Sequence, residues 1–421
     1  MTPRKNDARR AALAALRDFR SGRAAQAIDI HGLPERDKAL AVRLFYGVLQ
    51  NYYKIDACIA MASNISKIQP HVRDILRLGM YQLLFLDKIP KSAAVDESVK
   101  LVGYLKLPDR ARAFVNAVLR NAASWNEAPR FDELWIETSH PRWLVDALTE
   151  QEGFERAKAL LEFNNGIPPI YLQMIDWGYK DALLRAGAEE CPGFDGCLTA
   201  SGNVEKLPGF AEGAFIVADN AARMAVIAAA PAAGERVLDA CAAPGGKSVM
   251  LSHAAGGGIS LTSCDINKTK VNVLRETLAK YGVSGLQYIL DAAEFNADFE
   301  KSFDLVLADV PCSGIGVIRK KPDIRFKAWE SVQALPGLQL EILENLSRYV
   351  KPGGRLVYVT CTVLKAENRG VAEAFLERHN EFAIDSFSLP FAEAADGDIQ
   401  LWPPEHGTDG FYIERFRWAG K

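Results

Sequence analysis

Residues 236–248 read RVLDACAAPGGKS, an apolar run that ends in an aspartate and leads into a loop of small residues. The apolar run, at 236–240, predicts a buried strand, and the small residues let the loop backbone come close to a ligand. A helix that starts directly after such a loop presents free N–H groups at its positive end. This stretch therefore predicts a ligand-binding strand–loop–helix unit.

The same alternation of strand, loop and helix continues along the carboxyl half of the chain. Further strands are expected at 260–265, 286–290, 303–308 and 355–360, with a helix at 267–281. Strands that alternate with helices indicate right-handed crossovers and a parallel, doubly wound sheet. Ligands of such sheets lie at the carboxyl ends of the strands, near the point where the strand order reverses.

The front of the chain has a different periodicity. Across residues 8–125 apolar side chains recur every three or four positions, as at Leu40, Leu44 and Val48, and no alternating strand pattern intervenes. This pattern predicts an all-helical unit. Further helices and a small mixed segment follow, so we expect three domains, at 1–125, 126–215 and 216–421.

Charge is distributed unevenly between the two ends of the chain. Residues 1–125 hold 21 lysines and arginines against 11 acidic residues, whereas residues 126–421 hold 29 against 42. Such asymmetry indicates a front that touches a polyanion, of which nucleic acid is the usual one. A basic face that is merely solvated accounts for it equally well.

The cysteine content and the hydropathy exclude several classes of protein. Seven cysteines, an odd number spread thinly over 421 residues, argue against a disulfide framework and for reduced thiols in the cytoplasm. No apolar run reaches the roughly 18 residues that a transmembrane helix needs. Cys191 and Cys197 lack a second pair of ligands, so no metal site is expected. We interpret them, with Cys58 and Cys264, as small buried hydrophobes.

The loop after the first strand does not match the two common phosphate-binding motifs. It is neither G-x-G-x-x-G nor G-x-x-x-x-G-K-[ST]. A compact loop without a pyrophosphate cradle suits a nucleoside without phosphates, such as S-adenosylmethionine. Asp265, at the end of the second strand, is placed to accept hydrogen bonds from ribose hydroxyls, and Asp291, after the third, is placed to meet the adenine.

Two thiols follow the fourth and fifth strands. Cys312 lies in the segment DVPCS that begins at Asp309, and Cys361 lies between two threonines. Carbon 5 of cytosine is too weakly nucleophilic to attack a sulfonium methyl group, but a thiolate that adds to carbon 6 makes it enamine-like. The thiol needs a lowered pKa, and a carboxyl group such as that of Asp309 must hold the pyrimidine. The pattern therefore predicts covalent methyl transfer.

Four motifs resemble those of the Sun-type RNA cytosine-5 methyltransferases, and within them the bacterial 16S rRNA methyltransferase B (Sun/Fmu) branch. They are DACAAPGGKS (239–248), DVPCSGIGVIRKKPDIRF (309–326), KPGGRLVYVTCTV (351–363) and DGFYIERF (409–416). FVNAVLR (114–120) is similar to the NusB-type RNA-binding domain fused to that branch. The resemblance implies a multidomain fold, with an all-α NusB-like N-terminal domain and a C-terminal α/β, Rossmann-like class I S-adenosylmethionine methyltransferase sheet.

The resemblance also implies roles for the two thiols. In this family the Thr-Cys thiol, here Cys361, is the nucleophile, and the Pro-Cys thiol, here Cys312, assists breakdown of the adduct. In DNA cytosine-5 methyltransferases the Pro-Cys thiol attacks instead, so spacing alone points to Cys312 as the nucleophile. The second thiol, at Cys361, distinguishes the RNA-type assignment from the DNA-type one. The cofactor-binding positions of the family fall on Cys241, Ala242, Ala243, Pro244, Gly245, Gly246, Lys247, Asp265, Asp291 and Asp309.

The implied activity is methyl transfer from S-adenosylmethionine to carbon 5 of a cytosine in RNA, with 16S rRNA as the expected partner and without membrane or metal. The same chemistry on a tRNA or another rRNA is an alternative. A different class of alternative is an RNA-binding or antitermination-like factor with an inert methyltransferase half. A nicotinamide dehydrogenase would leave Cys312 and Cys361 unexplained.

A basic run follows Cys312. Residues 318–327 hold five basic residues and one acidic residue. This run predicts a phosphate clamp beside the active site, with Phe326 or Trp329 available to stack on a base; a solvated loop is the alternative. The expected RNA contacts are Arg319, Lys320, Lys321 and Arg325.

Overall fold

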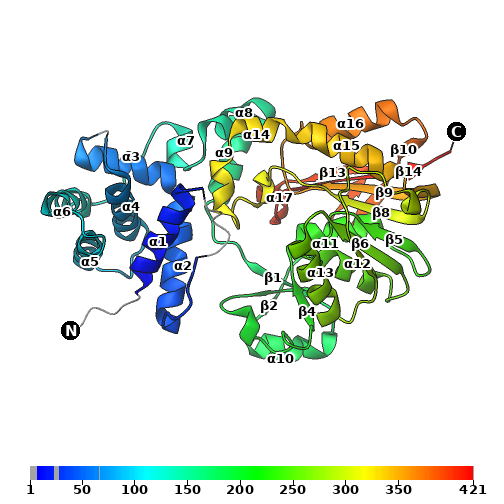
Figure 1. The fold of residues 1–421 in the computed structure, drawn as a ribbon, viewed down its shortest axis with the longest axis horizontal. Coiled ribbons are helices and arrows are strands. Elements are labelled where there is room, and N and C mark those ends of the chain that lie inside the picture. The colour runs from blue at the N-terminus through cyan, green and yellow to red at the C-terminus, as the bar shows by residue number, and fades with distance from the viewer. Residues whose placement is uncertain (1–6, 23–27, 66, 421) are drawn as a thin grey trace. The chain divides into compact units, whose positions relative to one another are not determined.

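A computed structural model describes residues 7–22, 28–65 and 67–420. The chain forms two compact units, one from Met1–Asn165 with Lys321–Phe326, the other from Gly166–Lys320 with Lys327–Lys421 (Figure 1). The finer division at 125 and 215 stays a prediction. Within the described residues, no helix combines the length and the apolar character that crossing a membrane requires.

The first unit is helical, as its periodicity predicts. Asp7 begins its first helix, because its carboxylate accepts hydrogen bonds from the backbone N–H groups of Arg9 (2.9 Å) and Arg10 (3.0 Å). The helices are α1 (Ala8–Arg20), α2 (Glu35–Gln50), α3 (Tyr52–Ser63), α4 (Pro70–Phe85), α5 (Lys91–Tyr104), α6 (Asp109–Ala123), α7 (Leu134–Glu137), α8 (Arg142–Glu152) and α9 (Phe154–Phe163).

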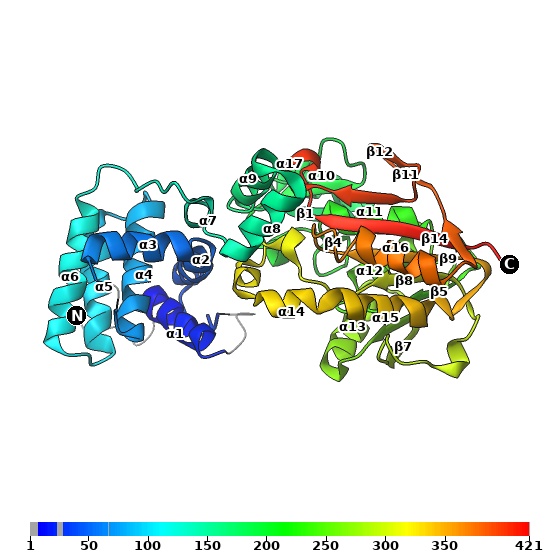
Figure 2. The same ribbon diagram turned by 90° about the horizontal axis from the view of Figure 1, so that it is seen from above.

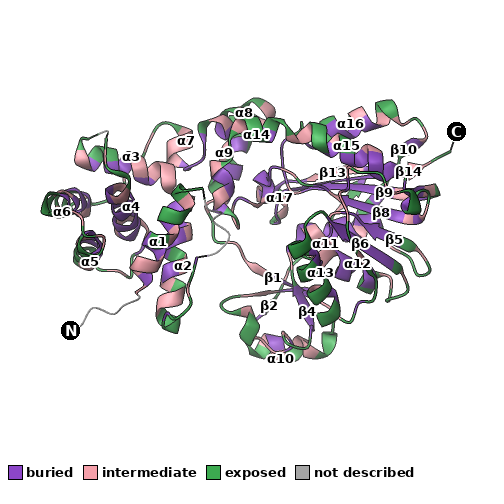
Figure 3. Cartoon of the chain, viewed as in Figure 1, coloured by how far each residue is buried: buried purple, intermediate pink, exposed green. Residues whose placement is uncertain are grey.

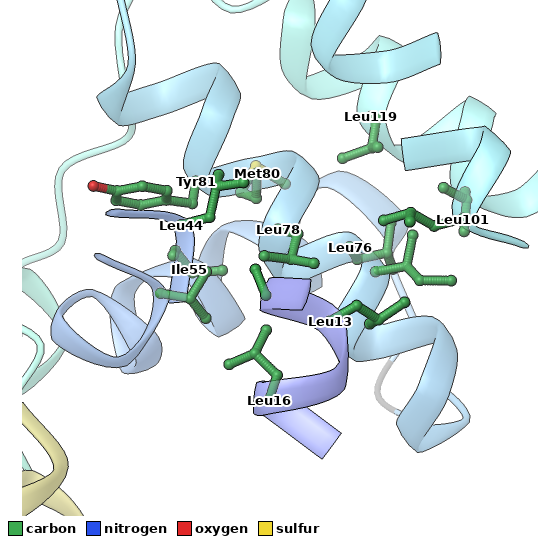
Figure 4. Close-up of a cluster of buried hydrophobic side chains, with 14 of the residues drawn as sticks. Leu13, Leu16, Leu44, Ile55, Leu76, Leu78, Met80, Tyr81, Leu101 and Leu119 are labelled. Carbon is green, nitrogen blue, oxygen red and sulfur yellow. The ribbon is translucent and has the colours of Figure 1, made fainter. Parts of the chain in front are cut away.

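The core of this unit is built from buried side chains of the helices α1 to α6, and α4 is buried at every position from Asp74 to Gln82. Figure 4 shows apolar side chains of these helices, among them Leu13, Leu44, Ile55, Leu101 and Leu119, meeting around residues of α4. Helices α2 and α4 approach closely at Gly47, where a β-carbon would lie 2.0 Å from Cζ of Tyr81. A larger residue at position 47 would therefore have to displace the Tyr81 ring.

A segment from the second half of the sequence completes the helical unit. The ring of Phe326, at the end of a short 3-10 helix (Pro322–Phe326), lies 4.8 Å from that of Phe19 and 4.8 Å from that of Tyr52. Arg325 is fully buried. Its guanidinium donates hydrogen bonds to the backbone carbonyl groups of Gln50 and Asn164 and to the side chain of Asn165.

The second unit contains a large mixed sheet with the strand order β10-β14-β9-β8-β5-β6-β7, and β13 pairs with β14. Strands β5 to β9 are parallel, and the order reverses between β5 and β8. The strands are β5 (Arg236–Asp239), β6 (Ser260–Asp265), β7 (Leu286–Ile289), β8 (Phe303–Asp309), β9 (Val350–Thr360), β10 (Phe382–Ile384), β13 (Asp398–Leu401) and β14 (Phe411–Trp418).

Helices cover both faces of this sheet (Figure 2). Val237 and Leu305 pack in a cluster with residues of α11 to α13, whereas their neighbours Leu238 and Val306 pack with residues of α15 and α16. This alternation leaves the central strands β5 and β8 buried on both sides, as Figure 3 shows. The helices are α11 (Asn220–Ala229), α12 (Gly246–Ala254), α13 (Lys268–Lys280), α14 (Trp329–Gln333), α15 (Leu335–Ser347), α16 (Arg369–Arg378) and α17 (Pro403–His406).

A small antiparallel sheet with the order β2-β3-β1-β4 precedes the large one. Its core includes Leu172, Leu198 and Phe215 from the strands, and Leu183 from α10. The elements are β1 (Ile170–Met174), α10 (Lys180–Arg185), β2 (Glu189–Glu190), β3 (Cys197–Ala200) and β4 (Phe215–Val217); a separate hairpin pairs β11 (Phe387–Leu389) with β12 (Ala392–Ala394).

The predicted fold class is confirmed. All five expected parallel strands are present, and the predicted helix at 267–281 corresponds to α13. The antiparallel strands β10, β13 and β14, which extend one edge of the parallel sheet, were not expected from the sequence.

Candidate active site

The loop between β5 and α12 is held closely against the sheet. The backbone N–H of Ala240 donates to the carbonyl of Leu307 (3.0 Å), and that of Ala242 donates to the carbonyl of Cys264 (2.8 Å). Gly245, with a φ of 111°, ends the loop directly before α12. A β-carbon there would lie 2.9 Å from Leu274, so the loop accepts only glycine at this point.

Acidic residues follow the parallel strands at their carboxyl ends. Asp239, Asp265 and Asp309 are the last residues of β5, β6 and β8, and Asp291 follows β7 after one residue. The carboxylate of Asp265 accepts a hydrogen bond from the backbone of Asn267 (3.2 Å). That of Asp291 accepts one from the backbone of Ala293 (3.0 Å). The predicted cofactor residues therefore lie along one edge of the sheet.

Asp239 is a buried acid within this group. The Ser248 hydroxyl donates a hydrogen bond to its Oδ2 (2.6 Å), and its Oδ1 has no hydrogen-bond partner among the described residues. Burial raises the pKa of Asp239 to about 7, although the hydrogen bond from Ser248 opposes this. A buried acid with a raised pKa thus ends β5, the strand that leads into the loop.

Lys247 and Asp309 form an ion pair across the loop. The Lys247 ammonium lies 2.7 Å from Oδ2 of Asp309 and 5.3 Å from the ring centroid of Phe411. Burial by itself lowers the pKa of Lys247, but the Asp309 carboxylate outweighs it, so the pKa is raised. A negatively charged Cys361 sulfur also raises the pKa of Lys247. Lys247 is therefore a cation within electrostatic reach of that thiol.

The two predicted thiols lie in contact. Sγ of Cys312 is 3.0 Å from Sγ of Cys361, and the backbone N–H of Cys361 points at the Cys312 sulfur (3.2 Å). Both are half-buried and both remain thiols. The hydrogen bond with Cys361, and then burial, raise the pKa of Cys312 well above its ordinary value. The ends of β8 and β9 thus bring together two sulfurs that are 49 residues apart in the sequence.

Buried polar groups that sequence reasoning missed support the thiols. The Thr360 hydroxyl donates to Oδ1 of Asn368 (2.6 Å), and the Asn368 amide donates to the carbonyl of Thr362 (3.2 Å). The neighbouring Glu367 accepts a hydrogen bond from the backbone N–H of Ser313 (2.8 Å). The signal for these residues was a Glu-Asn pair shortly after the Thr-Cys-Thr segment.

The basic run after Cys312 is not an open clamp. Lys320 donates to the carboxylates of Asp219 and Asp409, the latter at 2.9 Å. Arg319 is half-buried, and its charge lowers the pKa of Asp409, which burial raises to about 6. Lys321 is exposed, as the prediction requires.

Two residues of the run, Arg325 and Phe326, are part of the helical unit. That Arg325 contacts phosphate and that Phe326 stacks on a base stay predictions, which the packing of these side chains does not favour. The Arg325 guanidinium is buried against protein acceptors, and the Phe326 ring packs with Phe19 and Tyr52.

Comparison with known families divides the chain at similar places. The family described as "16S rRNA methyltransferase RsmB/F" matches residues 226–417, and the NusB family matches residues 6–124. The helical unit and the large sheet therefore each correspond to a known family.

Solved structures share this fold. The crystal structure of PH0851 is similar with a TM-score of 0.81 at 24% identity, covering 97% of this chain and 98% of that one. NSun6 from Pyrococcus horikoshii with SFG is similar with a TM-score of 0.60 at 15% identity, covering 67% of this chain and 99% of that one.

Curated relatives align along most of the sequence. The chain is 35% identical over 418 residues to the probable ribosomal RNA small subunit methyltransferase B of Bacillus subtilis, covering 92% of each chain. It is 35% identical over 402 residues to the ribosomal RNA small subunit methyltransferase B of Vibrio cholerae, covering 90% of this chain and 88% of the relative. The chain belongs to the ribosomal RNA small subunit methyltransferase B family.

Proposed function

We propose that this protein transfers a methyl group from S-adenosylmethionine to carbon 5 of a cytosine in 16S rRNA, through a covalent bond between Cys361 and carbon 6. The observation that carries the proposal is the pair of sulfurs 3.0 Å apart, with the Lys247–Asp309 ion pair nearby. Nucleophile, cation and carboxylate lie at the carboxyl edge of a parallel sheet, where such folds bind ligands.

The residues along this edge fit S-adenosylmethionine. The loop Cys241–Lys247 allows close backbone approach, and Asp265 and Asp291 would hold the ribose and the adenine. Oδ1 of Asp239, which has no partner among the described residues, supports the fit, because a buried carboxyl oxygen without a partner suits a ligand that donates a hydrogen bond. When bound, the cofactor supplies an electrophilic methyl group on a sulfonium.

The protein's own groups then account for each step at the base. The Cys361 thiolate, favoured by the Lys247 cation, adds to carbon 6 while Asp309 holds the pyrimidine. Carbon 5 becomes nucleophilic and takes the methyl group. Its proton passes to water, the bond between sulfur and carbon 6 breaks, and Cys361 departs as a thiolate. Cys312, held as a thiol by its raised pKa, can donate a hydrogen bond to that departing sulfur.

The choice of 16S rRNA as substrate rests on the relatives and on the front of the chain. The curated relatives are named for the RNA of the small ribosomal subunit. The NusB-family match covers the part of the chain with the excess of positive charge, as expected for a unit that docks RNA.

Substitution of each thiol in turn tests the mechanism. Purified protein is incubated with 16S rRNA and labelled S-adenosylmethionine, and bisulfite sequencing locates 5-methylcytosine. Cys361→Ala should abolish transfer, while calorimetry shows that the cofactor still binds. Cys312→Ala should accumulate a protein–RNA adduct that survives denaturing electrophoresis, because the departing thiolate loses its hydrogen-bond donor.

Cys264→Ala is the matched control, because this thiol is buried at the end of β6 and has no proposed role. Normal transfer by Cys361→Ala would remove the proposed nucleophile. Transfer to tRNA but not to 16S rRNA would replace the substrate and keep the chemistry.

A further inference from the structure

Glu367 is a buried carboxyl group that the steps above do not use. It is 1% exposed, and its Oε2 accepts hydrogen bonds from the backbone N–H of Ser313 (2.8 Å) and from the side chain of Gln339 (2.9 Å). The same Gln339 nitrogen donates to the carbonyl of Pro311 (3.1 Å). Pro311 and Ser313 flank Cys312, so Glu367 and Gln339 hold the backbone on both sides of that thiol.

Glu367 is itself tied to the strand that carries the other thiol. The Tyr358 hydroxyl, on β9, donates to the backbone carbonyl of Glu367 (2.6 Å). The hydroxyl groups of Ser313 and Thr362 lie 2.8 Å apart, which joins the residue after Cys312 to the residue after Cys361. Glu367 therefore links the two segments whose sulfurs are in contact.

The charges around Cys312 are unequal in their effects. The Glu367 carboxylate raises the pKa of Cys312, after the larger contributions of the hydrogen bond with Cys361 and of burial. The Tyr358 hydroxyl also faces this site, since the Cys312 sulfur acts on its pKa. The Lys327 ammonium lies nearby, 2.8 Å from the Ser313 carbonyl and 3.4 Å from that of Cys312. The ammonium group of Lys247, in contrast, interacts electrostatically with Cys361.

We propose that Glu367 is a positioning residue that fixes Cys312 against Cys361 and, through its charge, makes Cys361 the thiol that ionises first. This inference rests on the proposed function, in which Cys361 attacks as a thiolate while Cys312 stays protonated. Two thiols in contact cannot both ionise easily, so a buried carboxylate on the Cys312 side adds to the hydrogen bond and the burial that keep this thiol protonated.

The pH dependence of thiol alkylation tests this assignment without RNA or cofactor. The protein is treated briefly with iodoacetamide between pH 6 and pH 10, and the two thiols are quantified separately by mass spectrometry, in the tryptic peptides 302–319 and 356–365. In the unsubstituted protein Cys361 should be alkylated at lower pH than Cys312. In Glu367→Gln the Cys312 midpoint should fall toward that of Cys361, and a midpoint lower by about one pH unit makes the reaction at low pH tenfold faster.

Two further variants control for structural damage. Glu414→Gln removes another buried acid of the same unit, which hydrogen-bonds Tyr412, and should leave both midpoints unchanged. Glu367→Asp keeps the charge and should keep the order of ionisation. If circular dichroism shows that Glu367→Gln does not fold, the inference is judged by the order in which Cys361 and Cys312 are alkylated in the unsubstituted protein and in Glu367→Asp.

The inference would be overturned if the difference between the Cys312 and Cys361 midpoints were the same in Glu367→Gln as in the unsubstituted protein. It would also be overturned if Cys312 reacted at lower pH than Cys361 in the unsubstituted protein. Neither result bears on whether the protein methylates cytosine. Conversely, a protein with the expected alkylation order that transfers no methyl group to RNA would overturn the proposed function and not the thiol order.

Discussion

Asp239 is a single residue in which the demands of folding and of binding oppose each other. Its carboxyl group is buried at the end of β5, receives one hydrogen bond from Ser248, and leaves Oδ1 without a partner among the described residues. Burial of such a group is costly unless a ligand or a proton compensates it. The pKa of about 7 expresses that cost.

The stability of the protein should therefore depend on pH through Asp239. Its folded pKa is raised from 3.8 to about 7, so its stabilising contribution is complete below about pH 4 and is lost as the pH rises through 7. Asp239→Asn should flatten this part of the profile and, relative to the unsubstituted protein, gain stability at pH 8. Urea unfolding at several pH values, without cofactor, measures the difference.

Asp304→Asn should change the stability in the opposite direction, because the pKa of Asp304 is lowered in the folded protein. Burial raises the pKa of Asp304, but hydrogen bonds from Lys351 and from the backbone of Arg236 outweigh it, so the pKa is lowered. Its contribution is present above its unfolded pKa and is lost as the pH falls, so Asp304→Asn should destabilise the protein at pH 7. If the unfolding free energies of Asp239→Asn and of the unsubstituted protein changed with pH in parallel, Asp239 would not be the group responsible for this pH dependence.

Sequence reasoning worked for residues whose position relative to a strand end decides their place. Asp265 and Asp309 close parallel strands, so spacing alone puts them at one edge. It could not foresee the protein partners of Lys320 and Arg325, because their acceptors come from parts of the chain far away in sequence. A basic run looks the same whether its charges face phosphates or buried carbonyl groups.

At the scale of elements, one turn connects the thiol strand to its antiparallel neighbour. Gly316, in a short 3-10 helix (Ile315–Val317), donates its N–H to the carbonyl of Cys361 (3.0 Å) and accepts from the N–H of Gly410 (2.9 Å). A β-carbon on Gly316 would lie 1.9 Å from the carbonyl oxygen of Gly410. The turn thus fixes the end of β9 against the start of β14.

Gly316→Ala should force these segments apart. The added methyl group meets backbone atoms rather than a flexible side chain, so we expect a loss of about 1–3 kcal/mol of unfolding free energy, typical of overpacking, together with a lower rate of methyl transfer. Thermal unfolding and the transfer assay measure both. Gly337→Ala, in α15, is the control, because its added methyl meets nothing within 4 Å. Equal stability and activity for the two variants would refute the close approach.

Strand β14 shows why some elements escape sequence-based prediction. Its residues Phe411 to Phe416 are all buried, including Glu414 and Arg415, so the alternation that marks a half-exposed strand is absent. Its main partner β9 lies some 50 residues earlier in the chain. Strands β8 and β9, by contrast, carry the short apolar runs 305–308 and 356–359, which sequence reasoning recognises.

At the scale of the whole molecule, the positive charge of the helical unit is only partly available to RNA. Arg77 is buried and pairs with Asp56 (2.7 Å) and Asp74 (3.0 Å). Arg110 and Arg112 on α6 are exposed. Charge counted along the sequence therefore overestimates the charge that a phosphate meets.

Neutralising the exposed arginines should weaken RNA binding in a salt-dependent way. For Arg110→Ala combined with Arg112→Ala, the slope of log affinity against log salt concentration should decrease by about 0.7 for each phosphate of single-stranded RNA that the variant no longer neutralises. Filter binding to 16S rRNA at several potassium chloride concentrations measures the slope. The double replacement by lysine keeps the charge and should keep the slope. An unchanged slope in the alanine variant would mean that this face is only solvated.

Arg325 should behave in the opposite manner. Arg325→Ala leaves the acceptors at Gln50, Asn164 and Asn165 without their donor, so we expect a loss of about 2–4 kcal/mol of unfolding free energy and an unchanged salt slope. Lys321→Ala, at an exposed position of the same segment, should leave stability unchanged. Denaturant unfolding and the binding series separate the two effects. A reduced slope with full stability in Arg325→Ala would restore its role as an RNA contact.

The segment Lys321–Phe326 also has a consequence for biosynthesis. Because these residues are part of the helical unit, a nascent chain that has left the ribosome up to Asn165 still lacks the ring of Phe326 and the guanidinium of Arg325. Domains generally fold in the order of their synthesis. Here the amino-terminal unit finishes its interior only after most strands of the following unit have been translated, so maturation of the two units is coupled in time.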